Sequence, residues 1–356
     1  MNRAFWRGKK VLITGHTGFK GSWLSLWLQQ KGAQLVGFAL PPPTQPSLFE
    51  LARVGDGMET VTGDISEPRL ILDVMRRVQP EIVFHMAAQP LVQFSYQQPV
   101  ETYRTNVMGT VHLLEAVRQT PGVRAVVVVT SDKCYENKNW HWPYREFEPM
   151  GGRDPYASSK GCSELVTAAY RTSFFGPESD GKYPGGVATA RAGNVIGGGD
   201  WTPGRLVPDV MKSLLAGQNV ALRMVGAVRP WQHVLEPLGG YQLLAERLWE
   251  NPASCAEAWN FGPREESNQP VAWLVEQLLN AWGGEQAWRP DTEVYPHEDR
   301  MLKLDSSKAF NLLNWSPRLS LVDTLRWIVE WYRVLAAGGD IRQITEQQIR
   351  RFEERT

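Results

Sequence analysis

The chain has 356 residues, of which 42% are hydrophobic, and it carries 38 basic and 38 acidic residues. This balance gives no overall field that would recruit nucleic acid or an anionic membrane, and no apolar stretch reaches the roughly 20 residues of a membrane span. Three widely spaced cysteines form neither a disulfide framework nor a metal cluster, and the N-terminal segment resembles no signal peptide. We therefore expect a cytoplasmic globular protein with no metal, nucleic-acid or membrane partner.

In the first half of the chain, short apolar runs alternate with stretches whose apolar residues have helical spacing. Strands are predicted at 9–14, 34–38, 58–62, 81–86 and 124–130, and another near 186–195. This alternation predicts an α/β fold, a Rossmann-like doubly wound parallel sheet. The nearly uniform apolar character of the strands favours burial on both faces.

Beyond about residue 175 the alternation weakens into loops rich in aromatic, Gly and Pro residues, followed by separate helical segments. We expect a first domain over residues 1–180, with the strand near 186–195 shared between the two parts. A smaller, mixed domain over 196–356 would cover the end of the sheet.

The glycine-rich segment TGHTGFKG follows the first predicted strand directly and precedes a predicted helix. Glycines three residues apart allow a tight turn and the close approach of a pyrophosphate to a helix N-terminus. A glycine triplet alone is a weak signal, but its strand–turn–helix setting predicts a dinucleotide site. The candidate cofactor-binding residues here are Gly15, Thr17, Gly18, Phe19 and Gly21.

The segment after the second predicted strand lacks the acidic residue that normally binds the adenosine ribose. It reads VGFALPPPTQPS, and the first acid beyond it is Glu50. It also lacks an Arg or Lys that would accommodate a 2′-phosphate. The expected cofactor is therefore NAD rather than NADP.

The segment YASSK places Tyr156 and Lys160 four residues apart. If it is helical, both side chains lie on one face, and a lysine beside a tyrosine hydroxyl is expected to lower the tyrosine pKa. Such a tyrosine can take the proton of a substrate alcohol as hydride leaves. Tyr-x-x-x-Lys alone is a chance pattern, but its position after the glycine turn and the fifth strand makes it a candidate active site.

Six motifs in this order resemble the extended short-chain dehydrogenase/reductases: TGxxGFxG, GDI (63–65), HMAAQ (85–89), TNVMGT (105–110), TSDK and YASSK. RAGNVIGGGDW, RPWQHV and NFGPREE resemble the nucleotide-sugar branch of that family. More narrowly, GHTGFKGSWL, PSLFE, TSDKCYEN and GNVIGGGDW are similar to the CDP-glucose 4,6-dehydratases.

The resemblance implies a lyase that uses NAD to convert CDP-glucose to CDP-4-keto-6-deoxyglucose, a precursor of deoxysugars in surface polysaccharides. In this reaction C4 is oxidised, water is lost across C5–C6, and the same hydride returns to C6. The resemblance also implies a homodimer formed through the helix that contains Tyr156.

Residues are assigned by matching each motif to its position in this sequence. Asp64 would bind adenine, Asn106 would support the helix of Tyr156, and Ser131 would hydrogen-bond the sugar 4-hydroxyl. The implied cofactor contacts outside the glycine turn are Asp64, Ile65, Ala87, Ala88, Gln89, Asn106, Tyr156 and Lys160. The implied catalytic residues are Ser131, Asp132, Lys133, Tyr156 and Lys160. The implied substrate contacts are Ser131, Asn194, Arg205 and Arg229, although Arg205 could equally be an ordinary surface arginine.

Dehydration needs a base for the C5 proton and an acid for the departing C6 hydroxyl, and a 4-epimerase needs neither. Asp132 directly after Ser131 therefore favours dehydration. The dTDP-glucose dehydratases carry Asp–Glu here, whereas this chain has Lys133 in place of the glutamate. Lys133 either takes the C5 proton or stays charged and stabilises the enolate, and the neighbouring Asp132 favours the second role.

Successive side chains of a regular strand point to opposite faces, so Asp132 and Lys133 reach one pocket only if the strand breaks near Thr130.

Three alternative functions stay open. A UDP-N-acetylhexosamine 4,6-dehydratase also combines Asp with Lys, but those with this pair lack the tyrosine of YASSK. A 4-epimerase would not need Asp132, and a non-catalytic NAD-binding regulatory protein would need none of Asp132, Tyr156 and Lys160.

Overall fold

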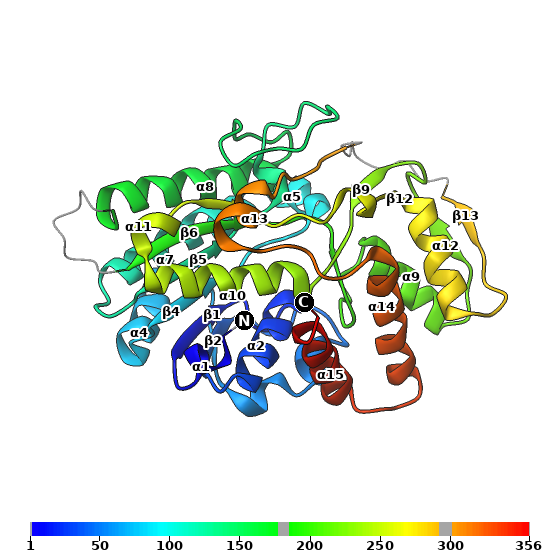
Figure 1. The fold of residues 1–356 in the computed structure, drawn as a ribbon, viewed down its shortest axis with the longest axis horizontal. Coiled ribbons are helices and arrows are strands. Elements are labelled where there is room, and N and C mark those ends of the chain that lie inside the picture. The colour runs from blue at the N-terminus through cyan, green and yellow to red at the C-terminus, as the bar shows by residue number, and fades with distance from the viewer. Residues whose placement is uncertain (1, 177–184, 292–300, 356) are drawn as a thin grey trace.

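The computed structural model describes residues 2–176, 185–291 and 301–355. Its centre is a sheet of seven parallel strands in the order β11-β6-β5-β4-β1-β2-β3 (Figure 1). The strands are β1 Lys10–Thr14, β2 Gln34–Ala39, β3 Glu59–Thr62, β4 Ile82–His85, β5 Ala125–Val129, β6 Gly186–Arg191 and β11 Ala258–Asn260. The predicted fold class is confirmed.

Helices cover both faces of this sheet. On one face lie α2 Phe19–Gln30, α10 Leu235–Glu250 and, against α2, α15 Ile341–Glu353. On the other lie α4 Pro68–Val78, α7 Gly109–Arg118 and α8 Pro155–Phe174. Along β5, Val127 and Val129 pack into the first layer while Val126 and Val128 pack into the second. The run of valines is therefore a central strand that is buried on both faces, as expected.

Among the described residues, three pairs of short strands and several helices lie beyond the sheet. The pairs are β7 Val195–Ile196 with β10 Gln232–His233, β8 Val220–Leu222 with β13 Trp288–Pro290, and β9 Val228–Pro230 with β12 Asn268–Pro270. The helices here are α9 Leu206–Leu215, α12 Val271–Trp282 and α14 Leu321–Ala336. The labelled elements β9, β12, β13, α9, α12 and α14 form the right-hand part of Figure 1.

Shorter elements connect these layers. They are α1 Arg3–Trp6, α3 Leu48–Leu51, α5 Val92–Gln97, α6 Pro99–Tyr103, α11 Pro252–Cys255, α13 Ser307–Leu313, the 3-10 turns Val54–Gly57, Asp132–Cys134 and Glu265–Ser267, and the π-helical turn Arg104–Met108. The strand β11 lies in a segment expected to be an aromatic-rich loop, and that expectation is wrong. Three residues carry no readable periodicity, and they form a strand because pairing with β6 satisfies their backbone groups.

The predicted domain boundary at residue 180 lies outside the described residues, and the two-domain division stays a prediction. Two elements from beyond residue 196, α10 and β11, pack on or extend the main sheet. The order of strands reverses between β1 and β4. In open α/β sheets the crevice outside the carboxyl ends of the strands at such a reversal is where ligands bind.

Candidate active site

The strand β5 ends at Val129, and residues Asp132–Cys134 form a 3-10 turn directly after it. Ser131 is the residue before this turn, and its hydroxyl donates a hydrogen bond to Oδ1 of Asp132 at 2.9 Å and accepts one from the backbone N–H of Lys133 at 3.2 Å. The predicted break of the strand near Thr130 is therefore confirmed. Asp132 is buried and Lys133 is half-buried. Because residues 131–134 include three of the predicted catalytic residues, we refer to them as the catalytic turn.

The segment YASSK forms the start of α8. The carboxylate of Asp154 accepts a hydrogen bond from the backbone N–H of Ala157 at 2.9 Å, and Pro155 is the first helical residue. Both features are typical of a helix start. Tyr156 and Lys160 are 9% and 6% exposed, one turn apart, and the Lys160 ammonium lies 3.4 Å from the carbonyl of Val129 at the end of β5. The start of α8 and the catalytic turn therefore lie next to each other.

Electrostatics at this place differ from one expectation. Burial raises the pKa of Tyr156 to about 12, while a hydrogen bond with Ser131 acts in the opposite direction. Burial also lowers the pKa of Lys160 to about 8. The expectation that Lys160 lowers the tyrosine pKa towards neutrality is therefore wrong for the chain by itself. Loss of water around the phenol outweighs the nearby charges.

The glycine turn between β1 and α2 is built as the spacing predicts. Gly15 has a φ of +76°, and a methyl group added there would lie 2.7 Å from the backbone nitrogen of Ala87. A methyl group on Gly21 would lie 2.2 Å from the carbonyl oxygen of Gly15. Gly18 precedes α2 and offers no capping side chain, so the first N–H groups of the helix stay available to an anion. Phe19 begins α2, and Thr17 donates a hydrogen bond to the carbonyl of Leu40 at 2.9 Å.

Of the other predicted cofactor contacts outside α8, all but Asn106 lie on the loops that follow β3 and β4. Asp64 accepts a hydrogen bond from the N–H of Ser66 at 2.8 Å, and Ile65 packs against Gly109. Ala87 and Ala88 lead from β4 to Gln89. Asn106, in the π-helical turn, accepts a hydrogen bond from the N–H of Gln89 at 2.8 Å and donates one to Ser159 in α8 at 2.8 Å. Asn106 therefore connects this loop to the helix that contains Tyr156.

A family model described as GDP-mannose 4,6 dehydratase matches residues 12–328 of this sequence. The chain belongs to this family. A CDP-glucose 4,6-dehydratase from Salmonella typhimurium is 52% identical over 349 residues, which cover 98% of this chain and 97% of that protein. A dTDP-glucose 4,6-dehydratase from Streptomyces antibioticus is 29% identical and covers 91% of this chain and 92% of its own.

Solved structures have the same fold. A dTDP-glucose 4,6-dehydratase from Streptomyces venezuelae, solved with NAD bound, superposes with a TM-score of 0.76 at 26% identity, covering 93% of this chain and 99% of that one. A UDP-glucose 4-epimerase from Stenotrophomonas maltophila gives a TM-score of 0.78 at 24% identity, covering 93% of this chain and 100% of that one. The second likeness concerns the fold alone.

The glycine turn of this 4,6-dehydratase family member fits NAD. Gly15 and Gly21 let the turn and the helix pack closely, since side chains there would collide with backbone atoms. At Gly18 the nearest atom to an added methyl group is 3.4 Å away, which leaves that side of the turn open to a pyrophosphate. The free helix N-terminus suits the phosphates, and the turn lies at the reversal of strand order, beside the loop that Asn106 connects to α8. NAD held there would supply the acceptor for a hydride and its later return.

The three predicted substrate contacts outside the catalytic turn come from separate segments of the chain. Asn194 follows β6 with a φ of +48°. Arg205 forms an ion pair with Asp200 at 3.2 Å, and its charge acts to lower the pKa of Tyr156. Arg229 lies in β9 and donates to the carbonyl of Val228 at 3.2 Å. Of the three, Arg205 thus lies within electrostatic reach of the catalytic helix.

Two residues near the reacting groups were not predicted. Lys20, in the first turn of α2, has its pKa lowered to about 8 by burial and by the charges of Arg205 and Lys160, while the charges of Asp132 and Asp200 act to raise it. Gly193 lies against Asp132, because a methyl group built on it would be 1.8 Å from Oδ2 of that carboxylate. The glycine before Asn194 was visible in the sequence, but only the fold shows what it packs against.

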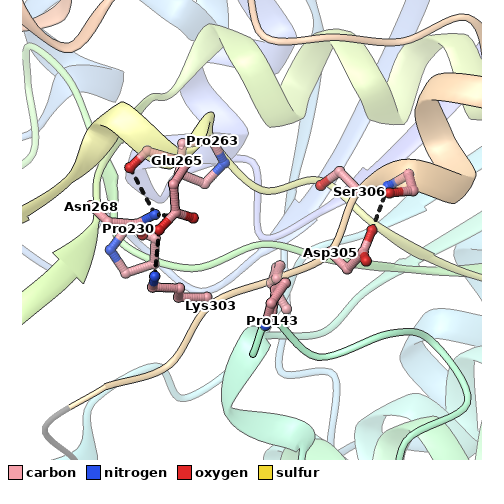
Figure 2. Close-up of a pocket in the computed structure, with 10 residues that line it drawn as sticks. Pro143, Pro230, Pro263, Glu265, Asn268, Lys303, Asp305 and Ser306 are labelled. Atoms are coloured by element: carbon pink, nitrogen blue, oxygen red, sulfur yellow. Dashed lines mark hydrogen bonds and ion pairs between the residues drawn. The ribbon is translucent and has the colours of Figure 1, made fainter. Parts of the chain in front are cut away.

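A separate pocket of about 220 Å³ lies beside β9 and β12 and is shown in Figure 2. Lys303 and Glu265 form an ion pair on its wall, and Asn268 donates to the same glutamate at 3.0 Å. These charges are satisfied by one another. The pocket contains none of the predicted catalytic residues.

Among the described residues, no group of three or more His, Cys, Asp or Glu side chains is arranged to hold a metal ion. Within the same part of the chain, no helix has the length and apolar character needed to cross a membrane.

Proposed function

We propose that this protein converts CDP-glucose to CDP-4-keto-6-deoxyglucose with NAD as a tightly recycled cofactor. The observation that carries the proposal is the placement of the Ser131–Asp132–Lys133 turn against Tyr156 and Lys160 of α8. The 52% identity to a CDP-glucose 4,6-dehydratase over nearly the whole chain supports CDP-glucose as the substrate.

In the first half of the reaction, C4 of the glucose is oxidised. Tyr156 takes the proton of the 4-hydroxyl as hydride leaves C4, and Ser131 holds this hydroxyl in place. Because burial raises the pKa of Tyr156 to about 12, the phenolate needs a nearby positive charge. Lys160 is one source of this charge, and the nicotinamide ring of bound NAD is another.

In the second half, water leaves across C5–C6. The new ketone makes the C5 proton acidic, and Asp132 donates a proton to the C6 hydroxyl as it departs as water. The C5 proton passes to a base, which is either Lys133 in its neutral form or another group while the charged Lys133 stabilises the enolate. Hydride then returns to C6 and a proton returns to C5, so that the reaction as a whole leaves NAD unchanged.

Asn194, Arg205 and Arg229 would hold the nucleotide diphosphate and the sugar. Guanidinium groups bind phosphate oxygens in pairs, which suits the two arginines. The ion pair of Arg205 with Asp200 fixes one guanidinium near the catalytic helix.

We further propose that the protein is a homodimer formed through α8. Leu165 in α8 and Val100 in the adjacent α6 are 61% and 80% exposed, and paired copies would bury both. Light scattering of Leu165→Glu should give a monomer mass. Leu312→Glu, at a residue 66% exposed in α13, should leave a dimer. A monomeric native protein would contradict the proposal.

The proposed setting is the cytoplasm, with the product used for deoxysugars of surface polysaccharides. Free cysteines at 134, 162 and 255 suit a reducing compartment. Activity found in the cytosolic fraction of lysed cells supports this setting, and activity confined to an extracytoplasmic fraction contradicts it.

The test of the function is incubation with NAD and CDP-, dTDP-, UDP- and GDP-glucose, with UDP-N-acetylglucosamine included. Mass spectrometry should find loss of one water from CDP-glucose, without net formation of NADH. A product of unchanged mass and altered C4 configuration would identify a 4-epimerase. Dehydration of another nucleotide sugar in preference to CDP-glucose would overturn the substrate, and no reaction with any of them would overturn the function.

A further inference from the structure

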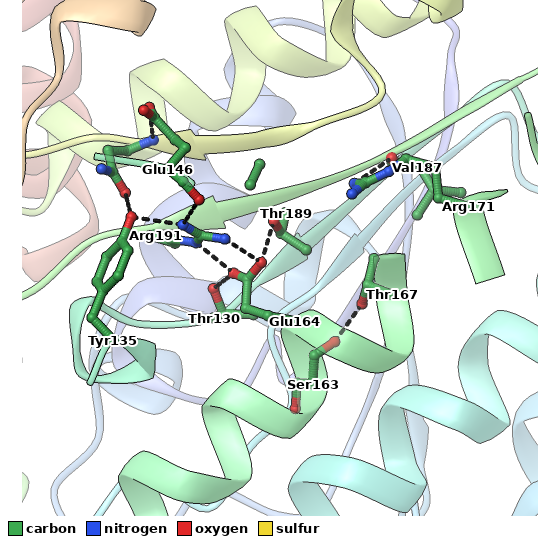
Figure 3. A network of polar contacts seen from close by, with 12 residues as sticks. Thr130, Tyr135, Glu146, Ser163, Glu164, Thr167, Arg171, Val187, Thr189 and Arg191 are labelled. Atoms are coloured by element: carbon green, nitrogen blue, oxygen red, sulfur yellow. Dashed lines mark hydrogen bonds and ion pairs between the residues drawn. The ribbon is translucent and has the colours of Figure 1, made fainter. Parts of the chain in front are cut away.

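Figure 3 shows a buried ion pair between Arg191 and Glu164, which contacts Thr130 and Tyr135 on either side of the catalytic turn. Arg191, at the end of β6, donates from Nε to Oε1 of Glu164 at 2.9 Å and from Nη2 to Oε2 at 2.8 Å. The two side chains are only 3% and 5% exposed. Although burial works to raise the pKa of Glu164, Arg191 and the surrounding hydrogen bonds outweigh it and hold that pKa below its ordinary value.

The pair contacts the chain on both sides of the catalytic turn. Just before the turn, the hydroxyl of Thr130 donates to Oε1 of Glu164 at 2.5 Å. Just after it, Arg191 donates from Nη1 to the hydroxyl of Tyr135 at 2.6 Å. The turn that carries Asp132 and Lys133 is therefore fixed at its two ends to the two members of one ion pair.

One member of the ion pair, Glu164, lies on the same helix as Tyr156 and Lys160. Glu164 lies on α8, four residues after Lys160 and eight after Tyr156, which is about one and two helical turns. All three side chains are buried. The carboxylate thus belongs to the helix that carries out C4 oxidation, while its hydrogen bond holds the turn that carries out elimination.

Stability alone is a weak explanation for such a pair, because the desolvation of two buried charges often cancels their attraction. What the pair supplies is a fixed relative position. We propose that Glu164 and Arg191 are positioning residues that hold Asp132 and Lys133 in register with Tyr156, so that elimination at C5–C6 follows C4 oxidation before the keto intermediate leaves. This inference rests on the proposed 4,6-dehydratase activity.

The chain offers a matched pair of variants for the test. Thr130 and Thr189 both donate to the carboxylate of Glu164, at 2.5 and 2.7 Å, but Thr189 lies within β6 and Thr130 adjoins the catalytic turn. Thr130→Val and Thr189→Val each remove one hydroxyl from the same carboxylate. Tyr135→Phe removes the contact at the far end, and Thr130→Ser restores the first contact.

The first readout is the share of the oxidised intermediate that goes on to elimination and the share that stays on the enzyme with NADH. In a single turnover with CDP-glucose, Thr130→Val and Tyr135→Phe should accumulate enzyme-bound NADH at least about tenfold above the native level, because elimination lags behind oxidation. Thr189→Val and Thr130→Ser should resemble the native enzyme. If all four variants lose oxidation and elimination in equal proportion, the pair is merely structural and the proposal is overturned. Native partitioning in Thr130→Val and Tyr135→Phe overturns it as well.

The second readout does not depend on activity. Hydrogen exchange of the backbone amides of residues 131–135 should accelerate in Thr130→Val and Tyr135→Phe, and stay at the native rate in Thr189→Val. If the native protein fails to dehydrate any nucleotide sugar while this exchange pattern appears, the proposed function fails and the positioning of the turn stands. Equal exchange in all variants overturns the positioning role, whatever the activity.

Discussion

The carboxylate of Asp132 occupies the space that a side chain on Gly193 would need. A methyl group at that glycine would lie 1.8 Å from Oδ2 of Asp132, and the hydroxyl of Ser131 donates to the opposite oxygen, Oδ1, at 2.9 Å. The acid is therefore held on two sides, by a backbone and by the serine that faces Tyr156. This arrangement fixes the carboxylate near Tyr156, as the proposed role of Asp132 as proton donor to the C6 hydroxyl requires.

Asp132→Asn should separate the two halves of the reaction. Asparagine has the same shape and keeps the packing on Gly193, but it cannot protonate the departing C6 hydroxyl. Turnover should fall roughly 100- to 10,000-fold, the usual contribution of a general acid, while oxidation at C4 continues. Stopped-flow absorbance should show NADH that forms and persists. If the variant forms no NADH and yet folds and binds NAD, Asp132 has a role in oxidation that this assignment does not include.

Lys133 can be tested by two substitutions, one that keeps the positive charge and one that removes it. Lys133→Arg keeps a positive charge but cannot act as a base near neutral pH, whereas Lys133→Met removes the charge. If the charge stabilises the enolate, exchange of the C5 hydrogen with deuterated solvent survives in the arginine variant and is lost in the methionine variant. Loss in both variants would assign the base role to Lys133, and undiminished exchange in both would remove it from the mechanism.

Two glycines of the NAD turn should respond differently to the same added methyl group. In Gly21→Ala the methyl would lie 2.2 Å from the carbonyl of Gly15, whereas in Gly18→Ala the nearest atom is 3.4 Å away. Overpacking of this kind typically costs about 1–3 kcal/mol. Thermal unfolding should therefore show a lower midpoint for Gly21→Ala and a nearly native one for Gly18→Ala.

Binding of NAD gives the complementary result for these variants. Calorimetry should show weaker NAD binding for both variants. In Gly21→Ala the methyl would displace the turn itself, and in Gly18→Ala the methyl would meet the pyrophosphate. Native NAD affinity in Gly18→Ala would place the pyrophosphate elsewhere.

Glu236 in α10 should make stability fall as pH rises. Burial raises its pKa to about 7 in the folded protein, against hydrogen bonds from the N–H groups of Leu319 and Arg318. The ordinary value is 4.5, so between these values the folded state binds more protons and loses stability with increasing pH. Glu236→Gln should remove this dependence, a difference on the order of 3 kcal/mol between pH 5 and 8. The free energy of unfolding of each protein is measured by denaturation at several pH values. If it changes with pH by the same amount in the native protein and in Glu236→Gln, the prediction is contradicted.

The sequence predicted the features that local pattern controls. Five strands of the first half could be predicted because short runs of apolar and β-branched residues alternate there with stretches of helical spacing. The strand β11 could not, since its three residues acquire their structure only by pairing with β6.

The parts of the site that depend on tertiary packing could not be predicted from the sequence either. Nothing near Tyr156 in the sequence indicates the burial that raises its pKa to about 12. The contact of Gly193 with Asp132 joins loops after two different strands, and Lys20 reaches the site because the glycine turn lies at the reversal of strand order. Such relationships follow from tertiary structure, which a motif does not contain.

The central claim is that one hydride leaves C4 and returns to C6 within a single active site. The most direct measurement uses CDP-glucose that carries deuterium at C4, with unlabelled NAD and ordinary water. Mass spectrometry and proton NMR of the product should find the deuterium at C6 of a molecule that has lost one water. Deuterium retained at C4, or released to free NADH in solution, would contradict the account.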